Sequence, residues 1–195
     1  MSKILFPNNQ YWHFSVPNAD ELNDYIDSID VDVDKPPNWV NLCDLHTFDY
    51  TDNIEGSREK FTELLNPSLK VFTSLVEKPN TSLQFYLDQC WINIYNEGHF
   101  QEPHEHEQVD LVAVYFLDDY QEEYGNFYFF DIHKPQIARY RAWKDIFSYT
   151  SDWFPHVKRG DIIFFPAYTY HGCTKHKSST PRRSVAFNFM MRVVK

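Results

Sequence analysis

The chain has 195 residues, which suits one ordinary domain with a buried core and room for an internal cavity. Hydrophobic residues make up 43% of the chain and aromatic residues 18%, and only 5 residues are glycine, so the composition excludes a disordered chain. The formal net charge of −10, from 18 Lys and Arg against 28 Asp and Glu, repels a phosphate backbone and disfavours nucleic acid as a partner.

The N-terminus and the cysteines indicate the compartment. The opening MSKILFPNNQYWHF holds a short apolar run broken by Pro7, which is too short for a signal peptide, and no stretch approaches the length of a membrane span. The three cysteines are scattered and form no C-x-x-C pair, so neither a disulfide framework nor a zinc knuckle is indicated. We therefore expect a soluble, cytoplasmic protein with reduced thiols.

Helical patterns occupy the first part of the chain. NADELNDYIDSI, residues 18–29, combines an Asn/Asp cap with a short amphipathic pattern. SREKFTELLNPSLKVFTSLVEK, residues 57–78, spaces its large apolar residues as a helix does, with Ser57 as the expected cap and Pro67 as an expected kink or break. Residues 1–80 are therefore predicted to form a helical support region.

From residue 82 onward, short runs of β-branched and aromatic residues predict strands. Loops separate the runs, which favours an antiparallel sandwich or barrel over alternating βαβ units. Residues 82–195 are predicted to form this β core, packed on the helices within a single domain of residues 1–195. The segment 135–159 fits poorly into the strand count and is interpreted as an insertion. The runs are SLQFYLDQCWINIYN, DLVAVYFLD, NFYFFDI, DIIFFP and SVAFNFMMRVV.

Imidazole and carboxylate side chains are concentrated in QEPHEHEQVD, residues 101–110. Residues two apart on an extended strand share a face, so His104 and His106 can offer two nitrogens to one metal ion. An H-x-H pair alone is equally compatible with two surface histidines near an acidic turn. The wider sequence context has to decide between these readings.

The residues around the pair resemble the first cupin motif. Gly98 precedes His104 with five residues between them, and Asp110 stands where the motif usually has Glu. Proteins with this motif share the double-stranded β-helix, a jelly roll whose open mouth holds a metal ion.

A second segment, GDIIFFPAYTYHGC, resembles the second cupin motif. Gly160, Pro166 and His171 have the spacing of that motif, whereas Tyr168 stands where Gly is expected and Lys175 where Asn is expected. The resemblance implies that His171 is a third metal ligand, delivered from a distant strand.

The basic pair in PRRSVAFNF distinguishes two branches of this fold. In 2-oxoglutarate/Fe(II) oxygenases an Arg at about this distance after the distal His binds the far carboxylate of 2-oxoglutarate, because a planar guanidinium forms two parallel hydrogen bonds to it. Arg182 shares a strand face with Ser184 and Asn188, which suit a cavity, whereas Arg183 shares one with bulky residues. We therefore predict that Arg182 binds the cosubstrate. Two solvated arginines after a proline turn are the alternative.

Residues 90–192 as a whole resemble small 2-oxoglutarate/Fe(II) oxygenases in the order and spacing of these motifs. The resemblance implies a mainly β fold with N-terminal helices, a cupin-like double-stranded β-helix, that binds Fe(II) and uses 2-oxoglutarate as cosubstrate. Tyr168 and Tyr170 are expected near its mouth. The site residues implied are His104, His106 and His171 for the metal, and Arg182, Asn93, Tyr95 and Tyr115 for the cosubstrate.

One position departs from the family pattern. His106 stands where most such oxygenases have an Asp ligand, so the metal site lacks an anionic ligand, which can favour oxygen chemistry without a cosubstrate. Asp110 can restore the charge by folding back to the metal, or it can accept a hydrogen bond from a ligand imidazole and fix its tautomer. We favour the second role.

The predicted function is that of a 2-oxoglutarate- and Fe(II)-dependent dioxygenase that uses O2 to hydroxylate a peptidyl, prolyl-like substrate or a small molecule. A metal-dependent cupin enzyme that works without 2-oxoglutarate is the first alternative, and it would make Arg182 dispensable and Asp110 essential. A non-catalytic jelly-roll binding module is the second.

Overall fold

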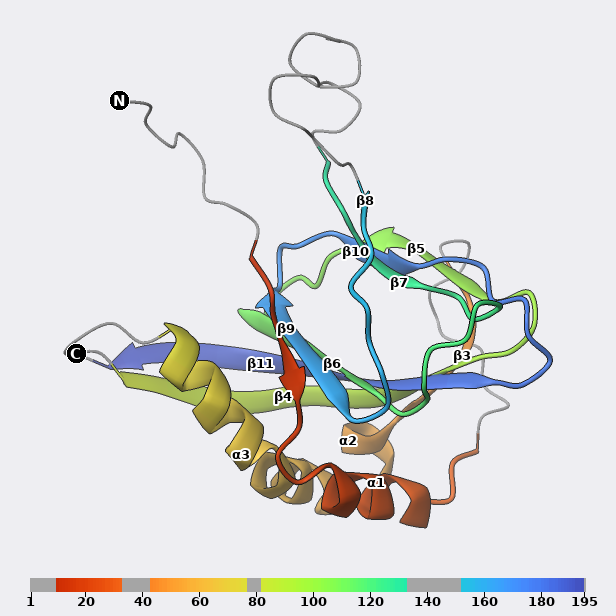
Figure 1. Cartoon of the computed structure of the whole chain (residues 1–195). Coiled ribbons are helices and arrows are strands. Elements are labelled where there is room, and N and C mark those ends of the chain that lie inside the picture. The colour runs from red at the N-terminus through yellow and green to blue at the C-terminus, as the bar shows by residue number, and fades with distance from the viewer. Residues whose placement is uncertain (1–9, 33–42, 77–81, 133–151, 195) are drawn as a thin grey trace, which may run out of the picture.

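The computed structural model describes residues 10–32, 43–76, 82–132 and 152–194. Three helices and eleven strands are assigned within these ranges (Figure 1). The helices are α1 (Ala19–Ser28), α2 (Tyr50–Asn53) and α3 (Ser57–Val76). The strands are β1 (Trp12–Ser15), β2 (Cys43–Asp44), β3 (His46–Asp49), β4 (Ser82–Tyr95), β5 (Phe100–His104), β6 (Leu111–Phe116), β7 (Phe127–Phe130), β8 (Asp152–Trp153), β9 (Asp161–Pro166), β10 (His171–Cys173) and β11 (Arg182–Val194).

The described strands form two antiparallel sheets. One sheet has six strands in the order β1-β9-β6-β11-β4-β3, and the other has five in the order β2-β5-β10-β7-β8. The helices lie along the outer side of the six-stranded sheet, and the five-stranded sheet lies on its other side (Figure 1). This arrangement confirms the predicted class, a mainly β jelly roll with N-terminal helices.

Both faces of the six-stranded sheet are buried, which explains its continuous apolar runs. In β6, Ala113 and Tyr115 belong to the core shared with the helices, whereas Val114 and Phe116 belong to the core between the sheets. The strand β9 alternates in the same way. A strand covered on both sides has no solvent face, so its sequence need not alternate between apolar and polar residues.

The first eighty residues contribute strands as well as helices, so the prediction of a helical support is incomplete. The strands β1 and β3 form the two edges of the six-stranded sheet, paired with β9 and β4, and β2 pairs with β5 in the other sheet. Strands of two to four residues are too short for a clear period-2 pattern. Of the predicted insertion 135–159, residues up to 151 lie outside the described residues, and the remainder holds β8 and the loop to β9.

The helix α3 continues through Pro67, so the expected break is wrong. The apolar face of the helix, including Phe61, Leu65 and Phe72, is buried in the core against the sheet. This packing offsets the hydrogen bond that a proline removes from a helix interior. Ser57 is the first helical residue, and its hydroxyl donates to the Tyr50 carbonyl at 2.7 Å.

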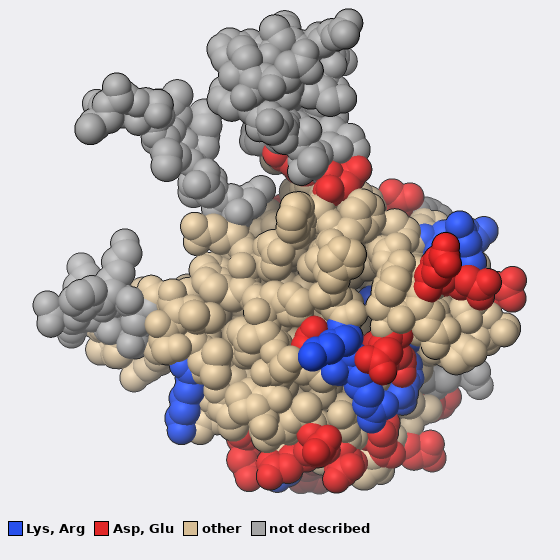
Figure 2. Space-filling view, in the orientation of Figure 1, with Lys and Arg blue, Asp and Glu red and all other residues tan. Residues whose placement is uncertain are grey.

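The outer face of α1 is acidic. Acidic side chains gather over this helix along the lower edge of Figure 2, and Asp20, Glu21, Asp24 and Asp27 are all exposed. Within the described residues, no helix combines the length and the hydrophobicity needed to cross a membrane.

Replacing Pro67 in α3 tests how much of the destabilisation by this proline the packing of the helix has to offset. We expect Pro67→Ala to raise the free energy of unfolding by about 1–3 kcal/mol, because alanine restores a helical N–H and removes the clash of the ring with the preceding turn. Urea unfolding followed by circular dichroism measures the change. The exposed neighbour Asn66→Ala is the control and should gain less than about 1 kcal/mol. A loss of stability in Pro67→Ala would contradict this account.

Candidate metal centre

Three histidines lie together between the sheets. His104 belongs to β5, His106 to the loop that follows β5, and His171 to the adjacent strand β10. His104 ends β5 and is the register partner of His171 at the start of β10. The ring centroids are 4.3 Å apart for His104 and His171, 5.0 Å for His106 and His171, and 5.3 Å for His104 and His106. One nitrogen of each ring lies within 4.8 Å of the others, a spacing at which one ion can be shared.

The hydrogen bonds of the three rings select one tautomer. Each Nδ1 faces an oxygen acceptor: the Glu102 carbonyl for His104 at 3.0 Å and the Thr169 carbonyl for His171 at 2.9 Å. For His106 the acceptor is the Asn188 side-chain oxygen, at 2.6 Å. With a proton on each Nδ1, each Nε2 carries the lone pair that a metal ion can accept, which is how ligand histidines are held in metal sites.

The surroundings keep these imidazoles neutral. Burial lowers the pKa of His104 and, together with the neighbouring His104 ring, lowers the pKa of His106 to about 4. Burial lowers the pKa of His171 well below its usual value, and the other two rings add to the effect. All three side chains therefore offer lone pairs at neutral pH, which is the state that binds a divalent cation.

A buried guanidinium shares the pocket with the histidines. Arg182 is 7% exposed, lines the same pocket, donates through Nη1 to the Cys173 sulfur at 2.8 Å, and lies over the rings of Tyr95 at 5.2 Å and Phe116 at 5.7 Å. It forms no ion pair among the described residues. A buried charge without a counter-ion is costly, so this position favours an anionic ligand. Arg183 faces the other way and pairs with Asp118 at 3.1 Å and Asp27 at 3.2 Å.

Polar side chains of β4 and β5 line the rest of the pocket. Asn93 accepts a hydrogen bond from the Trp91 indole at 3.2 Å, and the Tyr95 hydroxyl donates to Gln101 at 2.9 Å. The ring of Trp91 is stacked on that of His106 with centroids 5.7 Å apart. Asn93 and Tyr95 were predicted from the sequence and Trp91 was not, although alternation along β4 places Trp91 on their face.

Gln101 was missed because of an irregularity in strand pairing. His171 pairs with His104 whereas Cys173 pairs with Gln101, so two residue steps on β10 match three on β5. This bulge places Gln101 and His104, three residues apart, on one face, and their Nε2 atoms are 3.5 Å apart. Strict alternation would have put Gln101 on the opposite face.

The prediction that Tyr115 contacts the cosubstrate is wrong. Tyr115 is fully buried on the helix side of β6, where its hydroxyl donates to the Asn23 side chain at 2.9 Å. It therefore lies across the sheet from the histidines. Burial raises the pKa of this hydroxyl to about 12, which keeps it protonated.

Neither role considered for Asp110 is found. Its carboxylate accepts a hydrogen bond from the Met191 backbone N–H at 2.7 Å and joins the start of β6 to β11. The group of possible metal-binding side chains among the described residues does not include it. The acceptor for a ligand imidazole is instead Asn188, which the sequence analysis placed only on the cavity face of β11.

The family model for putative 2-oxoglutarate/Fe(II) oxygenases matches residues 89–188, just over half of the chain. The chain therefore belongs to this family, and the resemblance seen in the sequence is confirmed. Fe(II) and 2-oxoglutarate are its metal and cosubstrate. The neutral Nε2 donors and the unpaired Arg182 in one pocket fit both groups.

Solved structures share the fold at low sequence identity. A 2-oxoglutarate/Fe(II) oxygenase family protein from Burkholderia pseudomallei has a TM-score of 0.66 and 13% identity, with 92% of this chain and 84% of that chain covered. The epimerase SnoN from nogalamycin biosynthesis has a TM-score of 0.63 and 15% identity, with 93% of this chain and 78% of that chain covered. A prolyl-4-hydroxylase from Pseudomonas putida has a TM-score of 0.55 and 13% identity, with 94% of both chains covered. No curated protein matches the chain in sequence.

The Asn188 contact predicts a specific effect on metal affinity. Asn188→Leu removes the acceptor for the His106 Nδ1 proton and should weaken binding of Ni(II) or Fe(II) by about 10- to 100-fold. Anaerobic competition with a chromophoric chelator measures this affinity. Asp110→Asn is the matched control and should bind the metal as the wild type does. A comparable loss of metal affinity in Asp110→Asn would contradict this account and would indicate that the Asp110 carboxylate orients a ligand imidazole.

The lowered histidine pKa values predict acid sensitivity of the metal-free protein. Between pH of about 6.5 and 4 the unfolded chain protonates His106 and the folded chain does not, so stability must fall as the pH falls. The contribution of His106 reaches about 3 kcal/mol. Urea unfolding at several pH values should show a shallower fall for His106→Asn than for the wild type. If the unfolding free energy of both proteins fell equally with pH, the lowered pKa of His106 would be refuted.

Proposed function

We propose that the protein is a 2-oxoglutarate- and Fe(II)-dependent dioxygenase that hydroxylates a peptidyl, prolyl-like substrate or a small molecule. One observation carries the proposal: three imidazoles with nitrogens within 4.8 Å of one another and a buried guanidinium without a carboxylate partner line one pocket. The three imidazoles suit a divalent cation, and the guanidinium suits a carboxylate.

In this proposal His104, His106 and His171 hold the iron, and Arg182 binds the distal carboxylate of 2-oxoglutarate. Because the three ligands are neutral, the dianionic cosubstrate supplies the negative charge that an Asp ligand supplies in most relatives. When bound, iron and 2-oxoglutarate together activate O2 for attack on a C–H bond.

The chain itself orients these groups and limits access of water. Trp91, Val114 and Phe127 form apolar walls of the pocket, and the fixed Nδ1 contacts prevent the ligand rings from turning. A dry site of this kind strengthens the attraction between Arg182 and a carboxylate. Asn93 and Tyr95 lie on the same face of β4 and can orient the cosubstrate by hydrogen bonds.

The alternative of a cupin enzyme that works without 2-oxoglutarate has less support. It needs Asp110 at the metal, and that carboxylate is engaged by the Met191 N–H. It also leaves no purpose for a buried, unpaired Arg182, whose burial costs stability unless an anion binds.

Two adjacent arginines provide the test. Anaerobic addition of Fe(II) and 2-oxoglutarate should produce the weak visible charge-transfer band of a chelated keto acid. Arg182→Ala should weaken 2-oxoglutarate binding by about 10- to 150-fold, which corresponds to about 1.5–3 kcal/mol for hydrogen bonds to a charged group.

Arg183→Ala is the matched control, because this arginine is held by Asp27 and Asp118 outside the pocket, and it should leave the affinity unchanged. A metal-loaded protein without the band would contradict the proposal. So would a loss of affinity in Arg183→Ala that equals the loss in Arg182→Ala.

A further inference from the structure

A second hollow opens beside the metal centre. Its volume is about 540 Å³, within the range of small-molecule sites, and it lies between the end of α3, the strand β1 and the loops that follow β5 and β9. His106 is the one described residue that lines both this groove and the histidine pocket. A ligand that reaches this end of the groove lies next to one of the three histidines.

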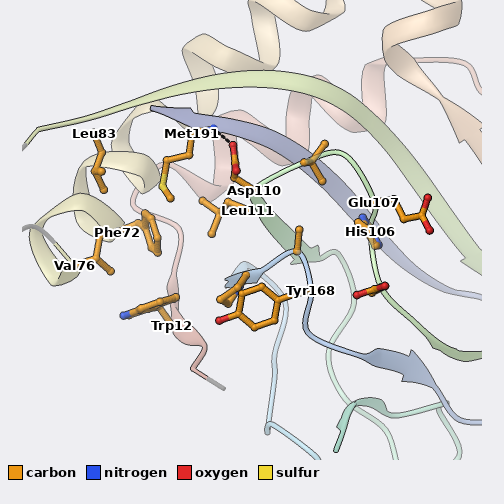
Figure 3. Close-up of a pocket in the computed structure, with 14 residues that line it drawn as sticks. Trp12, Phe72, Val76, Leu83, His106, Glu107, Asp110, Leu111, Tyr168 and Met191 are labelled. Carbon is orange, nitrogen blue, oxygen red and sulfur yellow. Dashed lines mark hydrogen bonds between the residues drawn. The ribbon is translucent and has the colours of Figure 1, made fainter. Parts of the chain in front are cut away.

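The end of the groove away from His106 is apolar. Trp12, Phe72, Val76 and Leu83 gather there, with Met191 close by (Figure 3). Trp12 meets Phe72 edge to face at 5.0 Å, which gives this end a rigid aromatic corner. Such a surface favours an aliphatic or aromatic part of a ligand.

The described residues that line the groove include acidic side chains of Asp and Glu. Glu105 and Glu107 are exposed and have no ion pair or hydrogen bond among the described residues, and Asp110 contributes a third carboxylate. No Lys or Arg is among its described lining residues. Glu107 lies beside His106 in Figure 3 with its carboxylate directed away from Tyr168, so its negative charge is present at the end of the groove next to the metal centre.

Tyr168 lies between these two ends (Figure 3). Its side chain is 53% exposed, and it stands where the second cupin motif has glycine. A glycine there would leave the middle of the groove without a side chain. An exposed aromatic face next to carboxylates attracts a cation through its π-electrons as well as through charge.

We propose that the groove binds the substrate through a cationic amine or guanidine joined to an apolar group. The cation lies beside Tyr168 at the acidic end of the groove, where Glu105 and Glu107 supply negative charge, and the apolar group packs against Trp12 and Phe72. The assignment as a substrate site rests on the proposed function, because it takes His106 as a ligand of the catalytic metal. An anionic substrate would be repelled by the same carboxylates.

Three probes with one apolar body test the charge preference: 4-phenylbutylamine, 4-phenylbutanol and 4-phenylbutanoate. Calorimetry is done anaerobically on the full chain with Ni(II) and 2-oxoglutarate. We expect the amine to bind at least about tenfold more tightly than the alcohol, and the carboxylate to bind least. The preference should decrease as salt is added, because the carboxylates are exposed. Equal binding of amine and alcohol would overturn the proposal.

Variants of the groove locate the effect. The double variant Glu105→Gln/Glu107→Gln should lose the preference for the amine while it binds the alcohol as before, and Tyr168→Ala should bind the amine more weakly. Glu55→Gln removes an exposed acid that does not line the groove and is the matched control. A preference that survives in the double variant would overturn the proposal.

A peptide arm separates the two sources of such a cation. Acetyl-Phe-Gly-Lys-amide is compared with the same peptide carrying norleucine in place of lysine. Preference for the lysine peptide supports a peptidyl substrate, and preference for the free amine alone supports a small molecule. Binding of neither probe overturns the inference. Titration of 2-oxoglutarate into the Ni(II)-loaded protein, before any probe is added, tests the proposed function separately. A wild type that prefers the amine but does not bind 2-oxoglutarate would refute 2-oxoglutarate as the cosubstrate and would support the groove as a site for cations.

Discussion

The pairing of β10 with β5 is the contact on which the site depends. It places His171 opposite His104, 67 residues earlier in the chain, and the bulge beside this pair turns Gln101 towards the same pocket. The close approach requires Gly172, because a Cβ at that position would lie 2.6 Å from the Gln101 carbonyl oxygen. Backbone hydrogen bonds between β5 and β10 thus determine the distance between the imidazoles of His104 and His171, which two exposed loops would hold less firmly.

Charge is distributed differently on the two sides of His106. The histidine pocket contains a guanidinium and no carboxylate among its described lining residues, whereas the groove contains carboxylates and neither Lys nor Arg. His106 itself is neutral, with its pKa lowered to about 4. The arrangement suits a dianionic cosubstrate on one side and a cationic substrate on the other, so each ligand is disfavoured at the position of the other.

Errors in the sequence analysis have a common physical origin. Tyr115 lies in a strand that is buried on both faces, so no polar alternation showed which face meets the metal. Asp110 is held by a backbone N–H from 81 residues further along the chain, a contact that no local spacing can predict. Pro67 remains helical because Phe61 and Phe72 pack on the sheet, and tertiary packing of this kind overrides local propensity.

The amino-acid sequence by itself determined the jelly roll, the family and the set of histidines, because these depend on apolar periodicity and on the spacing of glycine, proline and histidine along the strands. Alternation along β11 also separated Arg182 from Arg183, since a strand directs neighbouring side chains to opposite faces. Only the tertiary structure decided that Asn188 accepts from His106, that Gln101 enters the pocket and that the acidic groove adjoins the metal centre. Each of these depends on the register between strands far apart in the chain, which is set by the packing of the whole core.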